Sequence, residues 1–188
     1  MAGNTGEGLR YGAIETPEKY YLEWKNDTVN TIAQPLDEVS IDILEKCESL
    51  PDKLDWQIFS MFQKRRLLDL IHNFIVYDKG IKKICRHNQY FGVKKAQIKL
   101  SKNQGGIIWH TQGSGKTLTM VWLSKWILAN NPNARVLIVT DRDELDDQME
   151  KVYKGVDEKV YRTSSCADLV ATLNTTDKRL ICSLIHKF

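Results

Sequence analysis

The sequence has no apolar run long enough to span a membrane, no Cys-x-x-Cys pair and no Asn-Lys-x-Asp motif. The first absence argues against a membrane partner, and no signal-peptide pattern opens the chain, so we expect a cytoplasmic protein. The four cysteines stand singly, which argues against a disulfide framework or a zinc site. The missing Asn-Lys-x-Asp motif argues against a GTPase, which would need it to read guanine.

The 188 residues are enough for one domain with a buried core, or for one domain with an appendage. A hydrophobic share of 42% and a charged share of 27% are ordinary for a soluble globular protein. Residues 1–60 carry 5 Lys and Arg against 12 Asp and Glu, whereas residues 61–102 carry 11 against 2. The basic segment is compatible with a solvated helix face and equally with contact to phosphate or DNA.

The strongest chemical signal lies between residues 105 and 117, where an apolar segment leads into a Gly-rich turn and then into a helix. Backbone N–H groups of such a turn, together with the dipole of the helix N-terminus, favour a bound phosphate. We expect Lys116 to reach the β- and γ-phosphates of a nucleotide and the Thr117 hydroxyl to bind Mg²⁺, which makes these two the candidate catalytic residues. The predicted nucleotide-binding residues of the loop are Gln112, Gly113, Ser114, Gly115, Lys116 and Thr117.

The loop departs from the general pattern G-x-x-x-x-G-K-[ST] at its first position, where this chain has His110. A loop that keeps only the later glycines resembles motif I of superfamily 2 helicases and translocases. A small P-loop kinase usually keeps the first glycine. A chance Gly-Ser turn is the remaining alternative, and it is disfavoured because a predicted strand precedes the loop and a predicted helix follows it.

Apolar runs and helical periods alternate from residue 106 to the end of the chain. This alternation predicts an α/β fold with a doubly wound parallel sheet and right-handed crossovers. Residues 106–109, 136–140 and 180–184 should be parallel strands of one sheet, with the loop at its carboxyl edge. The further elements expected here are a short strand over 159–162 and helices over 116–128, 143–153 and 166–173.

The region before the loop is expected to be helical, after an extended or disordered Gly-rich lead over residues 1–16. Thr16 should cap a short helix in which Pro17 is the first residue. Asp52 or Asp55 can cap a longer helix. The other expected elements are an amphipathic helix over 36–49, one buried stripe over 54–77 with Lys64, Arg65 and Arg66 largely outside it, and a helix over 86–100.

Two short stretches carry further chemistry. Residues 86–91 resemble the adenine-recognising Q-type motif of superfamily 2 enzymes, and the Gln89 amide offers both an acceptor and a donor to adenine. Arg86 and Gln89 are therefore predicted to bind the nucleotide. Residues 139–148 resemble motif Ia, which touches the DNA backbone, so Arg142 is a candidate DNA-binding residue. The alternative assigns 136–141 to a Walker B strand, but Arg142 follows where a second carboxylate would be expected.

Taken together, the loop Gly-Ile-Ile-Trp-His-Thr-Gln-Gly-Ser-Gly-Lys-Thr, the run Val-Thr-Asp-Arg-Asp-Glu-Leu-Asp-Asp-Gln and the closing Ile-His-Lys-Phe look very like the R (restriction and translocation) subunit of type I restriction enzymes. The resemblance covers nearly the whole chain. It implies a RecA-like P-loop motor fold that uses ATP and Mg²⁺. Its implied partners are double-stranded DNA and the methyltransferase and specificity subunits of a restriction complex.

The same resemblance implies a domain organisation. Residues 1–52 would be a linker and helical region that follows a nuclease domain, and residues 53–188 would begin the first motor domain, with a helical lead-in over 53–104. On this interpretation the chain is an internal piece that by itself binds nucleotide weakly or not at all, hydrolyses no ATP and cuts no DNA. The alternatives are another superfamily 2 helicase or translocase, or a P-loop nucleotide-binding protein that is not a motor.

Overall fold

The computed structural model describes residues 1–25, 52–78, 80–141, 152–154 and 159–188. The chain forms two compact units: unit 1 comprises Met1–Ile75 and Lys82–Ile108, and unit 2 comprises Val76–Ile81 and Trp109–Phe188. The predicted helix over 36–49, most of the one over 143–153 and Arg142 lie outside the described residues. None of the described helices combines the length and the apolar character that a membrane crossing requires.

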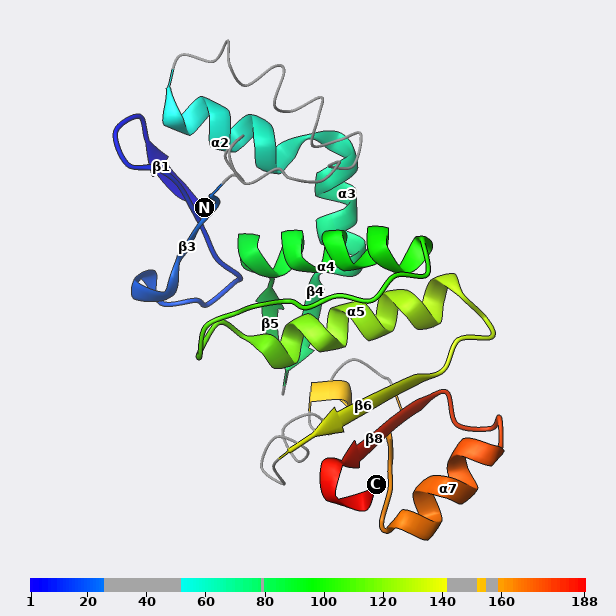
Figure 1. Ribbon diagram of the computed structural model, residues 1–188. Coiled ribbons are helices and arrows are strands. Elements are labelled where there is room, and N and C mark those ends of the chain that lie inside the picture. Colours follow the sequence, from blue (N-terminus) through cyan, green and yellow to red (C-terminus); the bar gives the residue numbers. More distant parts are fainter. Residues whose placement is uncertain (26–51, 79, 142–151, 155–158) are drawn as a thin grey trace. The chain divides into compact units, whose positions relative to one another are not determined.

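Unit 1 begins with a small antiparallel sheet. Its first two strands lie within residues 1–16, which agrees with the extended alternative for this stretch, whereas its third strand lies in the region that was expected to be helical. Strands β1 (Ala2–Asn4), β2 (Gly8–Tyr11) and β3 (Leu22–Glu23) pair in that order (Figure 1). The Asn4 side chain accepts a hydrogen bond from the Glu7 N–H at 2.7 Å, and Gly8 has a φ of 84°, so the Gly-rich lead closes a hairpin. Between β2 and β3 lies the 3-10 helix η1 (Glu18–Tyr20), whose N-cap is Pro17 and not Thr16.

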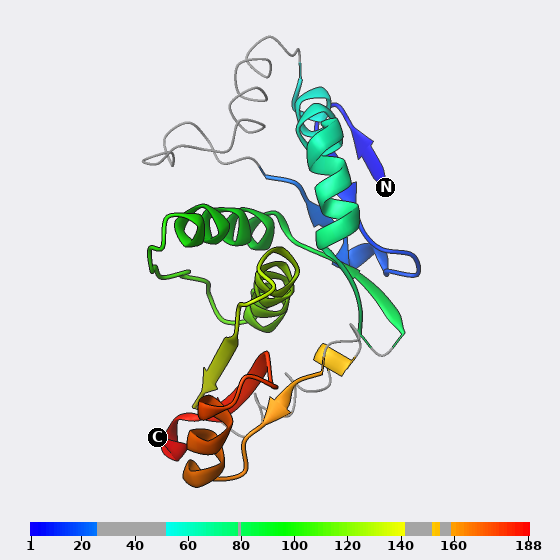
Figure 2. The ribbon, with the colours of Figure 1, turned by 90° about the vertical axis from the view of Figure 1, so that its right-hand side faces the viewer.

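The apolar stripe over 54–77 is divided among two helices and a strand. These are α2 (Lys53–Phe62), α3 (Lys64–Asn73) and β4 (Ile75–Asp78), which pairs with β5 (Ile81–Ile84). The predicted Asp52 cap of α2 is confirmed, because its carboxylate accepts from the Asp55 N–H at 3.0 Å. Gln63 ends α2, and its side chain caps α3 by accepting from the Arg66 N–H at 3.0 Å. A helical period continues across such a one-residue break, so the sequence pattern did not reveal it. Helix α2 packs against β2, and in Figure 2 the cyan end of this helix lies beside the blue strands.

Arg66 lies inside an aromatic core, which corrects the prediction that it is outside the buried stripe. Its side chain is 2% exposed, and its guanidinium carbon is 5.8, 5.5 and 5.3 Å from the ring centroids of Trp24, Tyr90 and Phe91. It donates hydrogen bonds to the Ser60 carbonyl at 3.0 Å and to the Ser60 hydroxyl at 2.8 Å. The aromatic faces and these acceptors together replace the water that an arginine normally requires.

Unit 2 contains a three-stranded parallel sheet. Its strands are β6 (Val136–Thr140), β7 (Tyr161–Arg162) and β8 (Leu180–Leu184), in the order β6-β8-β7. Val136 is paired with Leu180, and the register continues without a break to Thr140 and Leu184. The parallel pairing predicted for 136–140 and 180–184 is therefore confirmed. Helices α5 (Lys116–Asn130) and α7 (Cys166–Asn174) complete the described α/β arrangement.

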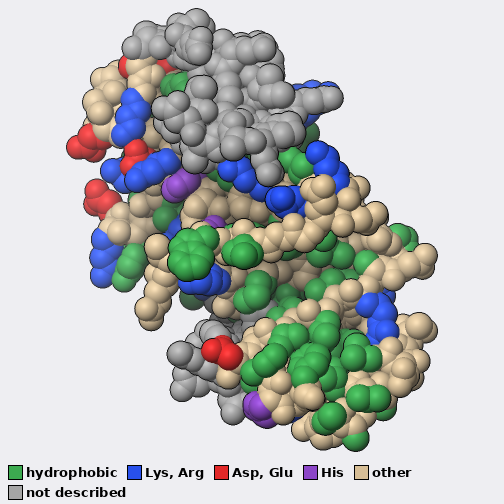
Figure 3. Space-filling model, viewed as in Figure 1, with side chains coloured by type: hydrophobic (Ala, Val, Ile, Leu, Met, Phe, Trp, Pro, Cys, Tyr) green, Lys and Arg blue, Asp and Glu red, His purple; other side chains and the backbone are tan. Residues whose placement is uncertain are grey.

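The core of unit 2 forms between α5, β6 and β8. Its buried members are Val121, Leu128, Ile138, Tyr153, Leu180 and Cys182. On β6 the side chains alternate, so that Leu137 and Val139 remain 37% and 43% exposed. Apolar side chains are gathered in the lower part of Figure 3, where Figure 1 draws β6 and β8. Leu137 and Val139 thus lie on a face of β6 that is more exposed than is usual in parallel sheets.

Residues 106–109 do not form the predicted strand. They have no regular secondary structure, and the side chains of Ile107 and Trp109 are 89% and 88% exposed. A strand is stable only beside a neighbour, and none of the described strands pairs with this segment. Gly105 and Gly106 also bring no side chains to pack and lose much backbone entropy when they are ordered. The structure shows a parallel α/β sheet without the strand that should lead into the loop.

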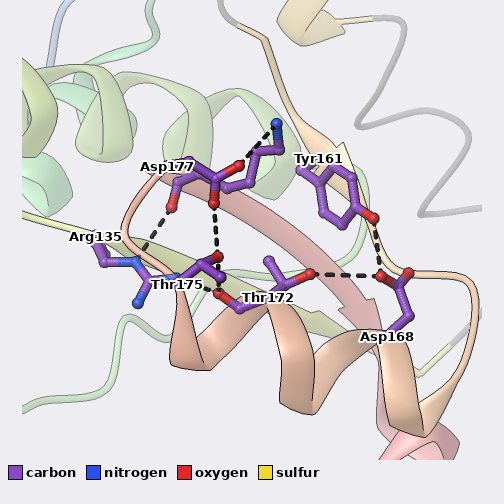
Figure 4. Close-up of polar contacts among 7 residues, drawn as sticks. Arg135, Tyr161, Asp168, Thr172, Thr175 and Asp177 are labelled. Carbon is purple, nitrogen blue, oxygen red and sulfur yellow. Dashed lines mark hydrogen bonds and ion pairs between the residues drawn. The ribbon is translucent and has the colours of Figure 1, made fainter.

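Two arginines fix the C-terminal ends of helices in unit 2. Arg135 donates to the Thr172 carbonyl at 2.8 Å and to the Leu173 carbonyl at 3.0 Å, at the end of α7 (Figure 4). Arg179 donates to the Leu128 carbonyl at 2.8 Å, near the end of α5. The last carbonyls of a helix lack intrahelical donors and carry partial negative charge, so a guanidinium satisfies both requirements. These contacts attach the two helices to the starts of β6 and β8.

Candidate nucleotide-binding site

Two glycines shape the loop that precedes α5. Gly113 has a φ of 76°, and Gly115, the N-cap of α5, has a φ of 82° and a ψ of 39°. A Cβ built on Gly113 would meet nothing within 4 Å, so the positive φ, and not crowding, is what requires glycine there. The backbone turns sharply at both residues and directs the chain into the helix.

Three donors converge on the carbonyl oxygen of Thr111. The Ser114 N–H lies 3.3 Å from it, the Ser114 hydroxyl 2.7 Å and the Lys116 ammonium nitrogen 2.8 Å. These contacts close a compact turn over residues 111–116 and hold the lysine ammonium against the loop. Ser114 is 7% exposed, so its hydroxyl is a structural part of the turn.

The N-terminus of α5 has no side-chain cap. The first turn of a helix has N–H groups without intrahelical acceptors and a partial positive charge, which favour an anion. Lys116 adds a full positive charge at the same end and is exposed, while Thr117 is half-buried behind it. An anionic phosphate oxygen would be a stronger acceptor for the Lys116 ammonium than the neutral Thr111 carbonyl. The residues present therefore fit a phosphate group, with the Thr117 hydroxyl as a candidate Mg²⁺ ligand.

Within the loop, the structure brings Ser114, Gly115, Lys116 and Thr117 to one helix end and leaves Gln112 and Gly113 exposed. The sequence did not predict that the Thr111 carbonyl is the common acceptor. The serine between the two glycines was a usable signal, because Ser hydroxyls often bond to backbone groups a few residues away. The role of a backbone carbonyl leaves no trace in the side-chain pattern.

Arg86 and Gln89 belong to unit 1, whereas the loop from residue 109 onward belongs to unit 2. They stand at the start of α4 (His87–Ser101), where the Gln89 side-chain oxygen accepts from the Arg86 N–H at 2.8 Å. Gln89 is 2% exposed. One function of this glutamine is therefore to cap α4. The pattern did not indicate this, because the N-cap residue is Arg instead of the usual Ser, Thr or Asp.

Comparison with known proteins gives one family match and several relatives. Residues 88–188 match the family model described as SWI2/SNF2 ATPase. An endonuclease subunit assigned to a type I restriction enzyme of Methanocaldococcus jannaschii is 33% identical over 147 residues, which are 72% of this chain and 14% of that protein. The HindI type I restriction enzyme endonuclease subunit of Haemophilus influenzae is 32% identical over 126 residues, which are 60% of this chain and 12% of that protein. The chain thus spans a small fraction of the length of these relatives.

Proposed function

Because the chain belongs to the SWI2/SNF2 ATPase family, we propose that it is the ATP-binding portion of an ATP-dependent DNA translocase and endonuclease subunit of a type I restriction-modification system. The resemblance to R subunits that the motifs indicated is confirmed by relatives at 32–37% identity. Translocation, cleavage and the restriction complex as a whole are proposed by analogy with those much longer proteins. The runner-up is another superfamily 2 DNA helicase or translocase, in which the loop would act in the same way.

The observation that carries the proposal is the arrangement of the loop on α5. Lys116 and the uncapped helix N-terminus would hold the β- and γ-phosphates of ATP, and Thr117 would hold Mg²⁺. The metal would neutralise charge that develops on the phosphates. The Thr111 carbonyl keeps the Lys116 ammonium close to the place that the phosphates would occupy. The proposed domain is a RecA-like sheet, of which β6, β7 and β8 would be the described strands.

The proposed adenine contacts are those of Arg86 and Gln89. Since the Gln89 side-chain oxygen already caps α4, base binding would require this amide to serve both roles or to exchange one partner for another. The proposed division places the start of the motor domain at residue 53. Residues 1–52 would be a linker region, whose described part contains the β1-β2-β3 sheet in place of the expected helices.

We propose that the motor moves along double-stranded DNA and contacts it through Arg142 and the basic segment 61–102. Two basic residues of that segment are poorer candidates for DNA contact, because Arg66 is buried and Lys94 forms an ion pair with Asp69 at 3.0 Å. Lys64 and Arg65 at the start of α3 are exposed and are better candidates. Contacts to DNA phosphates do not distinguish one base from another. Replacing both Lys64 and Arg65 by neutral residues should therefore weaken DNA binding equally on all sequences and reduce the dependence of this binding on salt concentration. Sequence-selective losses would contradict this assignment, since target choice is proposed to reside in the specificity subunit.

The test is calorimetric titration of the purified chain with Mg²⁺ and a non-hydrolysable ATP analogue. Replacing Lys116 by Ala should weaken binding about 10–100-fold, because a hydrogen bond to a charged group is lost. Replacing Lys125 by Ala on the same helix should change the affinity little. Equal affinities for the Lys116 variant and the wild type would overturn the proposal.

Hydrolysis provides a second test. Asp141 follows β6, but Arg142 stands where a second Walker B carboxylate would be expected. We therefore expect no steady-state ATPase activity and no DNA cleavage from this chain, with or without added DNA. Turnover that Lys116→Ala abolishes would instead assign the Walker B role to Asp141, which follows β6.

A further inference from the structure

The carbonyl oxygen of Thr111 receives more donors than it has lone pairs. A backbone carbonyl oxygen carries two lone pairs. Three donors reach this one, namely the Ser114 hydroxyl at 2.7 Å, the Lys116 ammonium at 2.8 Å and the Ser114 N–H at 3.3 Å. The two side-chain donors lie at nearly equal distances from the oxygen. The Ser114 hydroxyl and the Lys116 ammonium therefore compete for the same acceptor.

The two competing side chains differ in their freedom to leave this oxygen. Ser114 is 7% exposed, and its short side chain keeps the hydroxyl close to the backbone. Lys116 is exposed, and its ammonium stands at the end of a flexible four-carbon chain. The lysine is therefore the donor that can turn away. The hydroxyl and the N–H of Ser114 then match the two lone pairs of the Thr111 carbonyl.

We propose that Ser114 is a positioning residue for Lys116, and that its hydroxyl satisfies the Thr111 carbonyl when the lysine ammonium moves from this oxygen to a phosphate oxygen of the nucleotide. The inference rests on the proposed function, since it requires a nucleoside triphosphate in the loop. In this role the hydroxyl itself does not contact the nucleotide. Without it, the carbonyl would keep the Ser114 N–H at 3.3 Å after the lysine left, so the move of the lysine would cost more free energy.

The experiment compares Ser114 variants by displacement of a fluorescent ATP analogue in the presence of Mg²⁺. Ser114→Ala removes the hydroxyl, and Ser114→Thr keeps one. Ser124→Ala is the matched control on α5, because the Ser124 hydroxyl is also buried and also bonds to backbone carbonyls, those of Met120 at 2.8 Å and Val121 at 3.0 Å. Thermal unfolding without nucleotide measures the stability of each variant.

We expect Ser114→Ala to weaken ATP binding about three- to tenfold, which corresponds to one hydrogen bond to a backbone carbonyl. Ser114→Thr should recover most of that affinity. Ser124→Ala should lower stability and leave ATP affinity unchanged. In a Lys116→Ala background, Ser114→Ala should cause no further loss, because the hydroxyl acts on ATP binding through the lysine. Adenosine binding should be the same in all variants, since the lysine is proposed to bind phosphate.

The outcomes separate this inference from the proposed function on which it rests. A folded wild-type chain that binds no ATP overturns both. ATP binding that Lys116→Ala weakens and Ser114→Ala leaves unchanged overturns only the role of Ser114. That role is also overturned if a folded Ser114→Thr protein binds ATP as weakly as Ser114→Ala. An equal loss of affinity on Ser114→Ala with and without the lysine would overturn it too, because the hydroxyl would then act on the shape of the loop alone.

Discussion

The two units of this chain are stabilised by different means. Unit 1 is built around aromatic rings and a buried cation: Trp24 is fully buried, its ring centroid lies 5.6 Å from that of Tyr90, and Arg66 is packed against both rings. Unit 2 is built around an unbroken parallel register, with a core of mainly aliphatic side chains beside Tyr153, and arginines hold the ends of its helices. The first arrangement depends on side chains brought from distant parts of the chain, the second largely on backbone pairing.

The residues expected to determine stability and those proposed to bind a ligand lie largely in different parts of the chain. Thr111, Gln112, Gly113 and Lys116 of the loop in unit 2 are exposed, and the Lys116 ammonium bonds to the neutral Thr111 carbonyl, a partner that the proposed phosphate could replace. In unit 1, the buried Tyr11 hydroxyl donates to the Cys85 carbonyl at 3.0 Å. Burial raises the pKa of Tyr11 well above its ordinary value, which keeps this phenol a neutral donor. Substitutions in unit 1 should therefore act on stability, and substitutions in the loop should act on binding.

The largest expected effect is that of Arg66→Ala, which should lower the free energy of unfolding of unit 1 by about 3–5 kcal/mol. The substitution leaves a cavity among the aromatic rings and leaves the Ser60 carbonyl and hydroxyl without the donor that Arg66 supplies. Arg65→Ala, at an exposed neighbour, should cost less than about 0.5 kcal/mol. Urea unfolding followed by tryptophan fluorescence checks both. A loss of ATP affinity in the folded Arg66→Ala protein would contradict the separation between the units.

Gln89→Ala tests a residue of unit 1 that is expected to affect both stability and nucleotide binding. If Gln89 both caps α4 and contacts adenine, its loss should narrow the preference for ATP over GTP, by about 1–3 kcal/mol, and also lower stability. Competition of GTP with a fluorescent ATP analogue measures the preference. An unchanged ATP/GTP ratio with reduced stability would leave Gln89 as a capping residue and remove it from the nucleotide site.

Arg135→Lys should lower the stability of unit 2 by about 1–2 kcal/mol, although it preserves the charge. A lysine ammonium cannot serve the Thr172, Leu173 and Lys178 carbonyls together in the way that the planar guanidinium does. Amide hydrogen exchange should show the loss first at the end of α7. A uniform rise in exchange across both units would argue against a local clamp.

The smallest expected effect comes from Asp168→Asn at the start of α7 (Figure 4). Hydrogen bonds from the Ser164 N–H, the Tyr161 hydroxyl and the Ser164 hydroxyl lower the pKa of Asp168 below its ordinary value. Because the pKa of Asp168 is lower in the folded protein than in the unfolded chain, its ionised carboxylate stabilises the fold at any pH above the unfolded-state pKa of about 3.9. This stabilisation is lost as the pH falls through the folded-state pKa. The variant should therefore be less stable than the wild type near neutral pH, and the two should converge in acid. A stability difference independent of pH would disprove this account.

Much of unit 2 could be predicted from the sequence because its signals are local. Continuous apolar runs at 136–140 and 180–184 identify strands of a parallel sheet, and Ser165 with Asp168 marks the start of α7. The pattern predicted burial on both faces, which holds for β8 and is wrong for β6, where Leu137 and Val139 are exposed. The segment 106–109 also contains an apolar run, yet it is not a strand here. Whether an apolar run becomes a strand depends on a neighbour, and a neighbour is a property of the fold.

The sequence by itself determined the chemistry of the loop: two glycines able to adopt positive φ, a lysine and a threonine at the head of a helix, and a histidine in place of the first glycine. Tertiary structure alone decided which polar groups found partners. It buried Arg66 among three rings, engaged the Gln89 oxygen at a helix start and left Nδ1 of His110 without a partner among the described residues. The reason is physical: φ preference and charge belong to a residue and its immediate neighbours. Burial and hydrogen bonding depend on atoms that folding brings from elsewhere in the chain.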